Sequence, residues 1–170
     1  MKRKIDAFDY AGHICKAMTK GVLLTTRAGE KVNTMTIGWG KIGREWNLPV
    51  FIAYVRESRY TKQLLEENRE FTVNIPMGDF DPKILSYCGT KSGRDTDKIR
   101  DLGLTTVDSE NIQVPGIREF PLTLECRVIY RQNQELEKLP QAILNRFYPD
   151  PEDYHIAYYG EIVDAYILED

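Results

Sequence analysis

Apolar and polar residues alternate over several short stretches of the chain, a pattern that predicts a protein built mainly of β-strands. Including one continuous apolar run, the predicted strands span residues 21–26, 32–39, 49–55, 71–75, 122–130 and 155–168. Helices are expected singly between them, at 60–68, 82–87 and 140–147, with a helical turn at 98–102. A closed or nearly closed antiparallel barrel with peripheral helices fits this order best.

The composition is that of one ordinary globular domain, which we expect to span residues 1–170. Hydrophobic residues make up 42% of the chain and charged residues 29%, a balance that argues against disordered and fibrous classes. A chain of this length buries enough surface to form a core without disulfide bonds or structural metals.

Charge and cysteine content narrow the class of partner and the compartment. The net charge is −3 and the isoelectric point about 5.5, which argues against binding to nucleic acid or to an anionic membrane. The longest apolar run is far shorter than a membrane span. Three widely spaced cysteines form no CxxC pair, and acidic residues interrupt the basic N-terminus before any signal-like apolar run. We therefore expect a cytoplasmic location.

The segment 38–43 matches the GxGxxG pattern of dinucleotide-binding folds, but its context argues against that interpretation. The motif requires a helix to begin directly after the glycines, so that the helix N-terminus meets a pyrophosphate. Here Pro49 and the strand that it introduces leave no room for a helix. A glycine-rich loop between two strands is the better interpretation.

The segment 55–61 is a candidate phosphate site because a buried strand ends there and a helix begins. Helix N-termini leave N–H groups unpaired and carry partial positive charge, and Ser58 is a plausible N-cap. Arg56 and Arg59 add charged donors, while Ser58 and Thr61 add hydroxyls. From these residues alone, a solvated helix cap with two surface arginines is an equally good interpretation.

Two further segments offer groups to a ligand. The stretch from Gly89 to Lys98 contains Lys91, Ser92, Arg94 and Lys98, and so offers the small, hydroxyl and basic residues that a second phosphate wall needs, although such a stretch is more often an exposed loop. The strand segment 33–36 brings an amide and hydroxyls that suit either a polar strand face or the edge of a heteroaromatic ring.

The two histidines, His13 and His155, make a weak case for a metal site because no cysteine or carboxylate stands at ligand spacing. We therefore predict no metal. No Ser-His-Asp or Cys-His arrangement and no pair of carboxylates stands out. His155 lies among tyrosines of the last predicted strand, where a histidine is more often a packed residue than a catalyst.

Taken in order, these segments resemble the flavin reductase-like family, and within it the flavoredoxin-like branch. The segments 33–40 and 55–61, with the sequences NTMTIGWG and VRESRYT, carry the most specific likeness, and SGRDTDK at 92–98 matches a further flavin loop of the family. The resemblance implies an FMN-binding split β-barrel, antiparallel and of Greek-key type with peripheral helices. It also implies a homodimer with FMN near the subunit interface. The stretch 136–154 has no counterpart that we can name.

The resemblance further implies roles for individual residues. The phosphate of FMN is expected at Arg56, Ser58, Arg59, Thr61 and Lys98, and the flavin ring at Asn33, Thr34, Met35 and Thr36. Trp39, Tyr60, Gly89 and Ser92 complete the expected cofactor-binding set, and His155 is the candidate catalytic residue.

The implied function is an oxidoreductase that transfers a hydride from NADH or NADPH to flavin. This chemistry belongs to the cofactor, which is consistent with the lack of an acid–base pair in the sequence. The alternative is an electron-transfer protein that retains FMN and exchanges electrons with a protein partner. Flavin binding without redox turnover is the third alternative and ranks last among the ligand-binding functions. A protein that binds no ligand at all is the remaining alternative.

Overall fold

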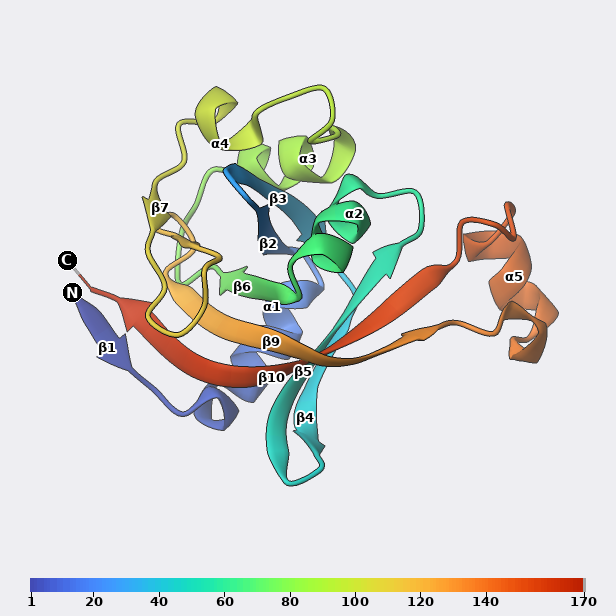
Figure 1. Cartoon of the computed structure of the whole chain (residues 1–170), viewed down its shortest axis with the longest axis horizontal. Helices are drawn as coiled ribbons and strands as arrows, with labels where there is room; N and C mark the ends of the chain where they lie inside the picture. Colours follow the sequence, from blue (N-terminus) through green and yellow to red (C-terminus); the bar gives the residue numbers. More distant parts are fainter. Residues whose placement is uncertain (170) are drawn as a thin grey trace.

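The computed structural model describes residues 1–169, in which one antiparallel sheet of eight strands curls around a central core (Figure 1). Along the sheet the order is β3-β2-β6-β9-β10-β5-β4, and β1 pairs with β10. The strands are β1 Lys2–Lys4, β2 Val22–Ala28, β3 Lys31–Ile37, β4 Gly40–Glu45, β5 Leu48–Arg56, β6 Glu70–Ile75, β9 Leu122–Asn133 and β10 His155–Leu168. β7 (Thr106–Val107) and β8 (Gly116–Ile117) form a separate pair.

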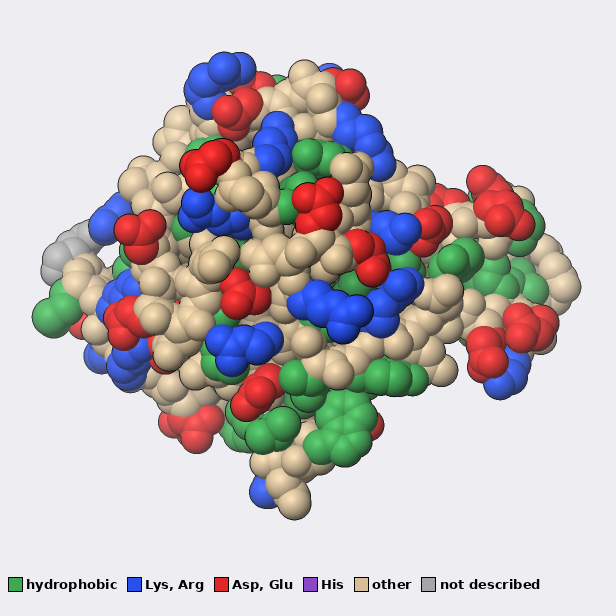
Figure 2. All heavy atoms as spheres, viewed as in Figure 1, with side chains coloured by type: hydrophobic (Ala, Val, Ile, Leu, Met, Phe, Trp, Pro, Cys, Tyr) green, Lys and Arg blue, Asp and Glu red, His purple; other side chains and the backbone are tan. Residues whose placement is uncertain are grey.

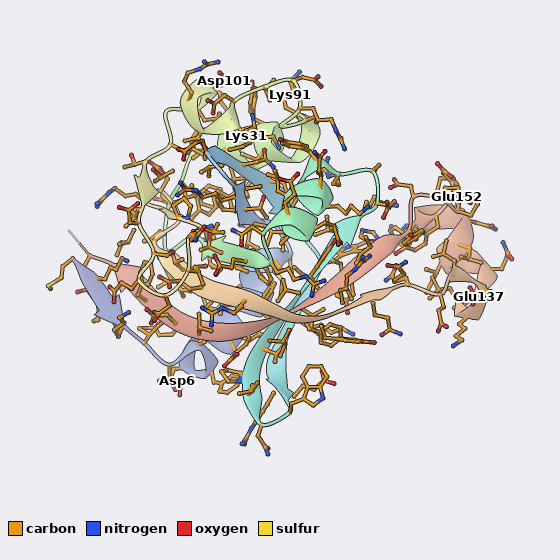
Figure 3. The ribbon with its side chains drawn as sticks, in the orientation of Figure 1. Asp6, Lys31, Lys91, Asp101, Glu137 and Glu152 are labelled. Atoms are coloured by element: carbon orange, nitrogen blue, oxygen red, sulfur yellow. The ribbon has the colours of Figure 1, made fainter. Side chains whose placement is uncertain are left out.

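The helices lie at the periphery of the barrel, as the sequence predicts. In Figure 1, α2 (Tyr60–Glu67), α3 (Pro82–Thr90) and α4 (Lys98–Asp101) gather near β2 and β3. The 3₁₀ turn η1 (Ala7–Tyr10) leads into α1 (Ala11–Met18). The turn η2 (Leu136–Lys138) and α5 (Gln141–Phe147) stand apart at the end of β9 and β10. We call residues 134–154 the arm; Glu137 and Glu152 mark it in Figure 3.

Two hydrophobic clusters hold the site in place. The larger fills the barrel and includes Leu24, Phe71 and Leu124, all fully buried. The smaller packs α3 against β2 through Leu23, Ile84 and Cys88. Fully burying one such aliphatic side chain contributes about 1.5–3 kcal/mol, so α3 is firmly fixed beside the edge of the sheet. None of the helices in residues 1–169 is long and apolar enough to cross a membrane.

The strand and helix predictions are confirmed in outline, but only residues 38–39 of the glycine-rich segment lie outside a strand. Residues Gly40–Glu45 form β4, which pairs with β5. Trp46 and Asn47 join the two strands with φ angles of +51° and +59°, the left-handed pair that a two-residue hairpin turn requires. Gly40 is a glycine because a Cβ there would lie 2.8 Å from the Phe51 ring. Glycines lower strand propensity, which explains the wrong prediction.

Two smaller predictions at the helix ends are also wrong. The N-cap of α2 is Arg59 rather than Ser58, and no side chain of residues 1–169 caps this helix. Gly89 lies inside α3 rather than in a loop, because this helix continues to Thr90. The sequence pattern does not predict α1, β1 or the short β7–β8 pair.

Candidate functional site

Two adjoining cavities lie where α2, β3 and β5 meet. Cavity A, about 160 Å³, is enclosed by the N-terminus of α2, by β3 and by the segment 91–98. Cavity B, about 450 Å³, lies among the ends of β3 and β5 and the start of β10. Because Met35, Ser58 and Arg59 line both, the two cavities form one continuous groove.

The predicted site residues divide between the two cavities. Those that line cavity A are Asn33, Met35, Ser58, Arg59, Tyr60, Thr61, Ser92 and Lys98. Those that line cavity B are Met35, Thr36, Trp39, Arg56, Ser58, Arg59 and His155. Thr34 and Gly89 line neither cavity, yet each supplies a backbone carbonyl that holds a basic side chain of the groove.

Lys98 is a buried cation on the wall of cavity A. Only 4% of the residue is exposed, and its ammonium donates to the carbonyl oxygens of Thr34 (3.0 Å) and Cys88 (3.1 Å). No carboxylate within residues 1–169 pairs with it. Burial, reinforced by the nearby charge of Arg59, lowers the pKa of Lys98 to about 8. An ammonium buried without a counter-ion favours binding of an anion.

Arg59 is the second basic group and reaches both cavities. Its guanidinium donates to the carbonyl of Gly89 at 3.0 Å, and no salt bridge to it is found in the described chain. Burial lowers the pKa of Arg59, although a guanidinium remains charged in proteins. Its remaining N–H groups are therefore available to a ligand in the groove.

The N-terminus of α2 adds neutral donors to cavity A. Tyr60 and Thr61 are its first two residues, and among residues 1–169 no hydrogen bond from either backbone N–H is found. Free N–H groups at this position attract anions. Arg94 closes the cavity from the opposite side, where it donates to the Ser58 carbonyl at 3.1 Å and lies over the Tyr60 ring. Lys91, labelled in Figure 3, also lines this cavity.

Strand β3 presents backbone groups to the groove because it ends the sheet order and pairs on one side with β2. The Asn33 carbonyl faces β2, where Thr26 donates to it, whereas the Thr34 carbonyl faces outward to Lys98. Successive residues of a strand alternate in direction, so the N–H and carbonyl of Thr36 also face outward. Thr36 lines cavity B, so these two backbone groups are a candidate donor and acceptor for a ligand there.

Arg56 binds the arm through its side chain. Its guanidinium donates at 2.9 Å to the carbonyl of Asp153 and at 2.9 Å to that of Phe147. It also lies over the Tyr148 ring, at 5.3 Å from the centroid. The side chain lines cavity B but not cavity A. Arg56 thus ties the arm to the end of β5.

An aromatic wall closes cavity B. The Trp39 ring lies 4.8 Å from that of His155 and 5.2 Å from that of Phe147. His155 Nδ1 lies 2.7 Å from the Tyr148 hydroxyl. Burial, with a further contribution from the charge of Arg56, lowers the pKa of His155 to about 4. The imidazole is therefore neutral near pH 7.

Among the residues that line the groove, the sequence pattern did not single out Tyr54, Gly93 and Asp153. Lys91 and Arg94 were expected as basic residues of a second phosphate wall but not as members of the cofactor-binding set, and both line cavity A. Asp153 lies in the arm, whose sequence offered no signal. Within residues 1–169 no group of three or more metal-binding side chains is found.

The comparison with known proteins identifies the family. The model of the flavin reductase-like domain matches residues 16–170, and the chain therefore belongs to the flavin reductase-like family. An uncharacterized protein of Archaeoglobus fulgidus is 36% identical over 59% of this chain and 55% of its own length. One of Pyrococcus abyssi is 28% identical over 62% of this chain and 59% of its own length. The matched region thus spans little more than half of these relatives.

Solved structures give the same fold and place the chain near the flavoredoxin branch. Flavoredoxin of Desulfovibrio vulgaris is 25% identical, with a TM-score of 0.68 over 88% of this chain and 69% of its own. Flavoredoxin of Methanosarcina acetivorans is 29% identical, with a TM-score of 0.65 over 88% of this chain and 68% of its own. An FMN-binding protein of Thermus thermophilus, 18% identical, shares the fold with a TM-score of 0.66 over 85% and 68% of the two chains. The fold is the split barrel of flavin reductase-like FMN-binding domains.

Proposed function

We propose that this protein binds FMN in the groove and acts as an oxidoreductase, with NADH or NADPH as the reductant. One observation supports the proposal most directly: the basic residues Arg59 and Lys98 line cavity A, and within residues 1–169 neither forms a salt bridge with a carboxylate. A phosphate there would supply the missing negative charge, and each charge-assisted hydrogen bond contributes about 1.5–3 kcal/mol.

The donors of the groove fit the parts of FMN. Cavity A offers cations, hydroxyls and free helix N–H groups, which suit a phosphate. Cavity B offers the outward N–H and carbonyl of Thr36 and the aromatic wall of Trp39 and His155, which suit a flat heteroaromatic ring. In this proposal Lys98 and Arg59 hold the phosphate, while Thr36 and Trp39 orient the ring. FMN, when bound, would supply the redox chemistry, since its ring system takes up and returns electron pairs.

A titration of the ligand-free protein with FMN and riboflavin tests the binding. Riboflavin lacks the phosphate, so we expect FMN to bind at least roughly tenfold more tightly, which corresponds to about 1.4 kcal/mol. Equal affinities would mean that cavity A does not bind the phosphate.

The reaction needs a separate test. Mixing the FMN-loaded protein with NADH or NADPH without oxygen should bleach the flavin absorbance, because the reduced ring absorbs little visible light. No bleaching with either nucleotide would reject the nicotinamide-dependent activity.

The two flavoredoxin neighbours favour a second candidate, an electron-transfer protein that retains FMN. Such a protein would be reduced by a redox protein, for example reduced ferredoxin, and not by NADH or NADPH. The bleaching experiment with these two kinds of reductant separates the candidates.

We also propose that the protein is cytoplasmic and forms a homodimer. Figure 2 shows hydrophobic side chains gathered at the lower edge of the molecule, where Figure 1 places the β4–β5 hairpin. Trp46, at its tip, is 54% exposed, and its ring lies 6.0 Å from those of Tyr130 and Tyr159. An exposed aromatic cluster of this kind fits a protein interface. Light scattering of the Trp46→Ser variant at several concentrations tests it, and an unchanged dimer would exclude this surface.

A further inference from the structure

His155 has one ring nitrogen without a protein partner. Its Nδ1 is bonded to Tyr148, but within residues 1–169 no hydrogen bond to its Nε2 is found. In the described chain, the Tyr166 hydroxyl is the one solvent-inaccessible side-chain polar atom that makes no hydrogen bond. Since Nε2 of His155 also makes none, Nε2 must be accessible to solvent. Nε2 therefore faces open space, and cavity B is the space that His155 lines.

The hydrogen bonds of Tyr148 determine which ring nitrogen of His155 carries the proton. The Tyr148 hydroxyl has a single proton and donates it to Gln134 Oε1, 2.6 Å away. Toward His155 the hydroxyl oxygen is then an acceptor, so Nδ1 must carry the N–H that bonds to it. A neutral imidazole has one N–H, and Nε2 therefore keeps a lone pair.

The arm holds Tyr148 rigidly in this arrangement. Its ring meets that of His155 edge-on, at 5.6 Å and 88°. The Arg56 guanidinium lies over the Tyr148 ring and binds the carbonyl of the preceding residue, Phe147. On its other side His155 contacts Trp39, so the ring has little freedom to turn.

We propose that Tyr148 is a positioning residue that fixes His155 in the Nδ1–H tautomer, so that Nε2 accepts a hydrogen bond in cavity B from an N–H donor of a bound ring compound. The inference rests on the proposed function, because it concerns the same groove. The pyrimidine edge of a flavin and the carboxamide of a nicotinamide both offer such a donor. A carboxylate has no N–H to donate, and its negatively charged oxygens would be repelled by the lone pair on Nε2.

Long-range ¹H–¹⁵N spectra of the ligand-free protein with ¹⁵N-labelled histidine test the tautomer near pH 7.5. His13 is an internal reference, because its Nε2 lies 2.8 Å from the Pro76 carbonyl and must donate a proton to it. We expect the two histidines to show protons on opposite nitrogens. A proton on Nε2 of neutral His155 would overturn the proposal.

Three variants separate positioning from general packing. Tyr148→Phe removes the acceptor for Nδ1–H, so the Nε2–H form of His155 should appear. Gln134→Glu keeps an oxygen that accepts the Tyr148 proton, and the tautomer should remain. Tyr154→Phe is the matched control in the arm, since this hydroxyl accepts from Asn133 at 3.3 Å and takes no part in the chain from Gln134 to His155. Unchanged His13 signals report an intact fold, and a Tyr148→Phe protein with the wild-type tautomer would overturn the proposal.

Ligand additions identify the source of the donor. Movement of the His155 Nε2 resonance on adding FMN assigns the donor to the flavin. If the resonance moves only when nicotinamide is added to the FMN-loaded protein, the donor is the carboxamide of nicotinamide. Nicotinate, which lacks the N–H, is the matched control ligand. No movement with either compound, or an equal response to nicotinate, would overturn the acceptor role. A protein that binds no FMN would reject the proposed function and leave the tautomer result standing.

Discussion

The backbone of Gly93 packs directly against the side chain of Asn33. A Cβ atom on residue 93 would lie 2.2 Å from Asn33 Oδ1 and 2.8 Å from the Tyr60 ring, closer than real Cβ contacts. Asn33 is itself held by a hydrogen bond from its Nδ2 to the Thr61 hydroxyl, at 3.2 Å. All four residues line cavity A, so the shape of that cavity depends on residue 93 being a glycine.

Gly93→Ala should therefore damage the cavity without unfolding the protein. The added methyl group forces either Asn33 or the segment 91–95 to move, which displaces the groups proposed to bind phosphate. We expect FMN affinity to fall roughly tenfold, about 1.4 kcal/mol, by fluorescence titration. Gly43→Ala is the control, because a Cβ at Gly43 meets nothing within 4 Å. Equal affinities of the two variants would show that FMN does not use cavity A.

Lys98 should make the binding of the phosphate depend on pH. Its pKa in the free protein is about 8, lowered mainly by burial, and a bound phosphate would raise that pKa by stabilising the charged form. FMN affinity relative to riboflavin should thus fall roughly tenfold between about pH 7 and pH 9, as Lys98 loses its proton. Burial raises the pKa of the neighbouring Cys88 to about 11, above this range, and Arg59 stays charged throughout. Lys98→Met should bind FMN weakly and abolish the pH dependence; a dependence that persists would come from another group.

The two arginines at the end of β5 should have different functions, although the sequence makes them look equivalent. Arg59→Ala should reduce the preference for FMN over riboflavin, since Arg59 lines cavity A. Arg56→Ala should leave that preference intact and release the arm, because two bonds to carbonyls of the arm are lost. The loss in stability is about 1–3 kcal/mol. Limited proteolysis should then cut the arm faster in Arg56→Ala than in Arg59→Ala, and the reverse pattern would exchange the two roles.

The sequence predicts the strands well because their periodicity reflects burial directly. The final strand was predicted at 155–168, and β10 spans His155–Leu168. Prediction failed where a local preference and the tertiary structure disagree. The glycines of β4 disfavour a strand, yet Gly40 is required by the close approach of Phe51.

Most of the predicted site residues line one groove, but the sequence could not separate them by the contacts that they make. Arg56 and Arg59 stand three residues apart before the same helix, so composition cannot tell them apart. Their contacts differ because Arg56 meets Asp153 of the arm, which lies almost one hundred residues away along the chain. The arm itself carries no recognisable motif, and the contact between Tyr148 and His155 depends on how β9 and β10 fold back together.

His155 should make the stability of the protein fall in mild acid. Its pKa drops from an ordinary 6.5 to about 4 on folding, chiefly because of burial, so the unfolded chain binds more protons over this interval. The stabilisation is complete above about pH 6.5 and is lost as the pH falls toward 4; by about pH 5 the loss is roughly 2 kcal/mol. Urea unfolding of the wild-type protein and of His155→Gln at about pH 7.5 and pH 5 measures it. The variant should lose less stability than the wild type between these two conditions. An equal loss in both proteins would mean that His155 is not held neutral by the fold.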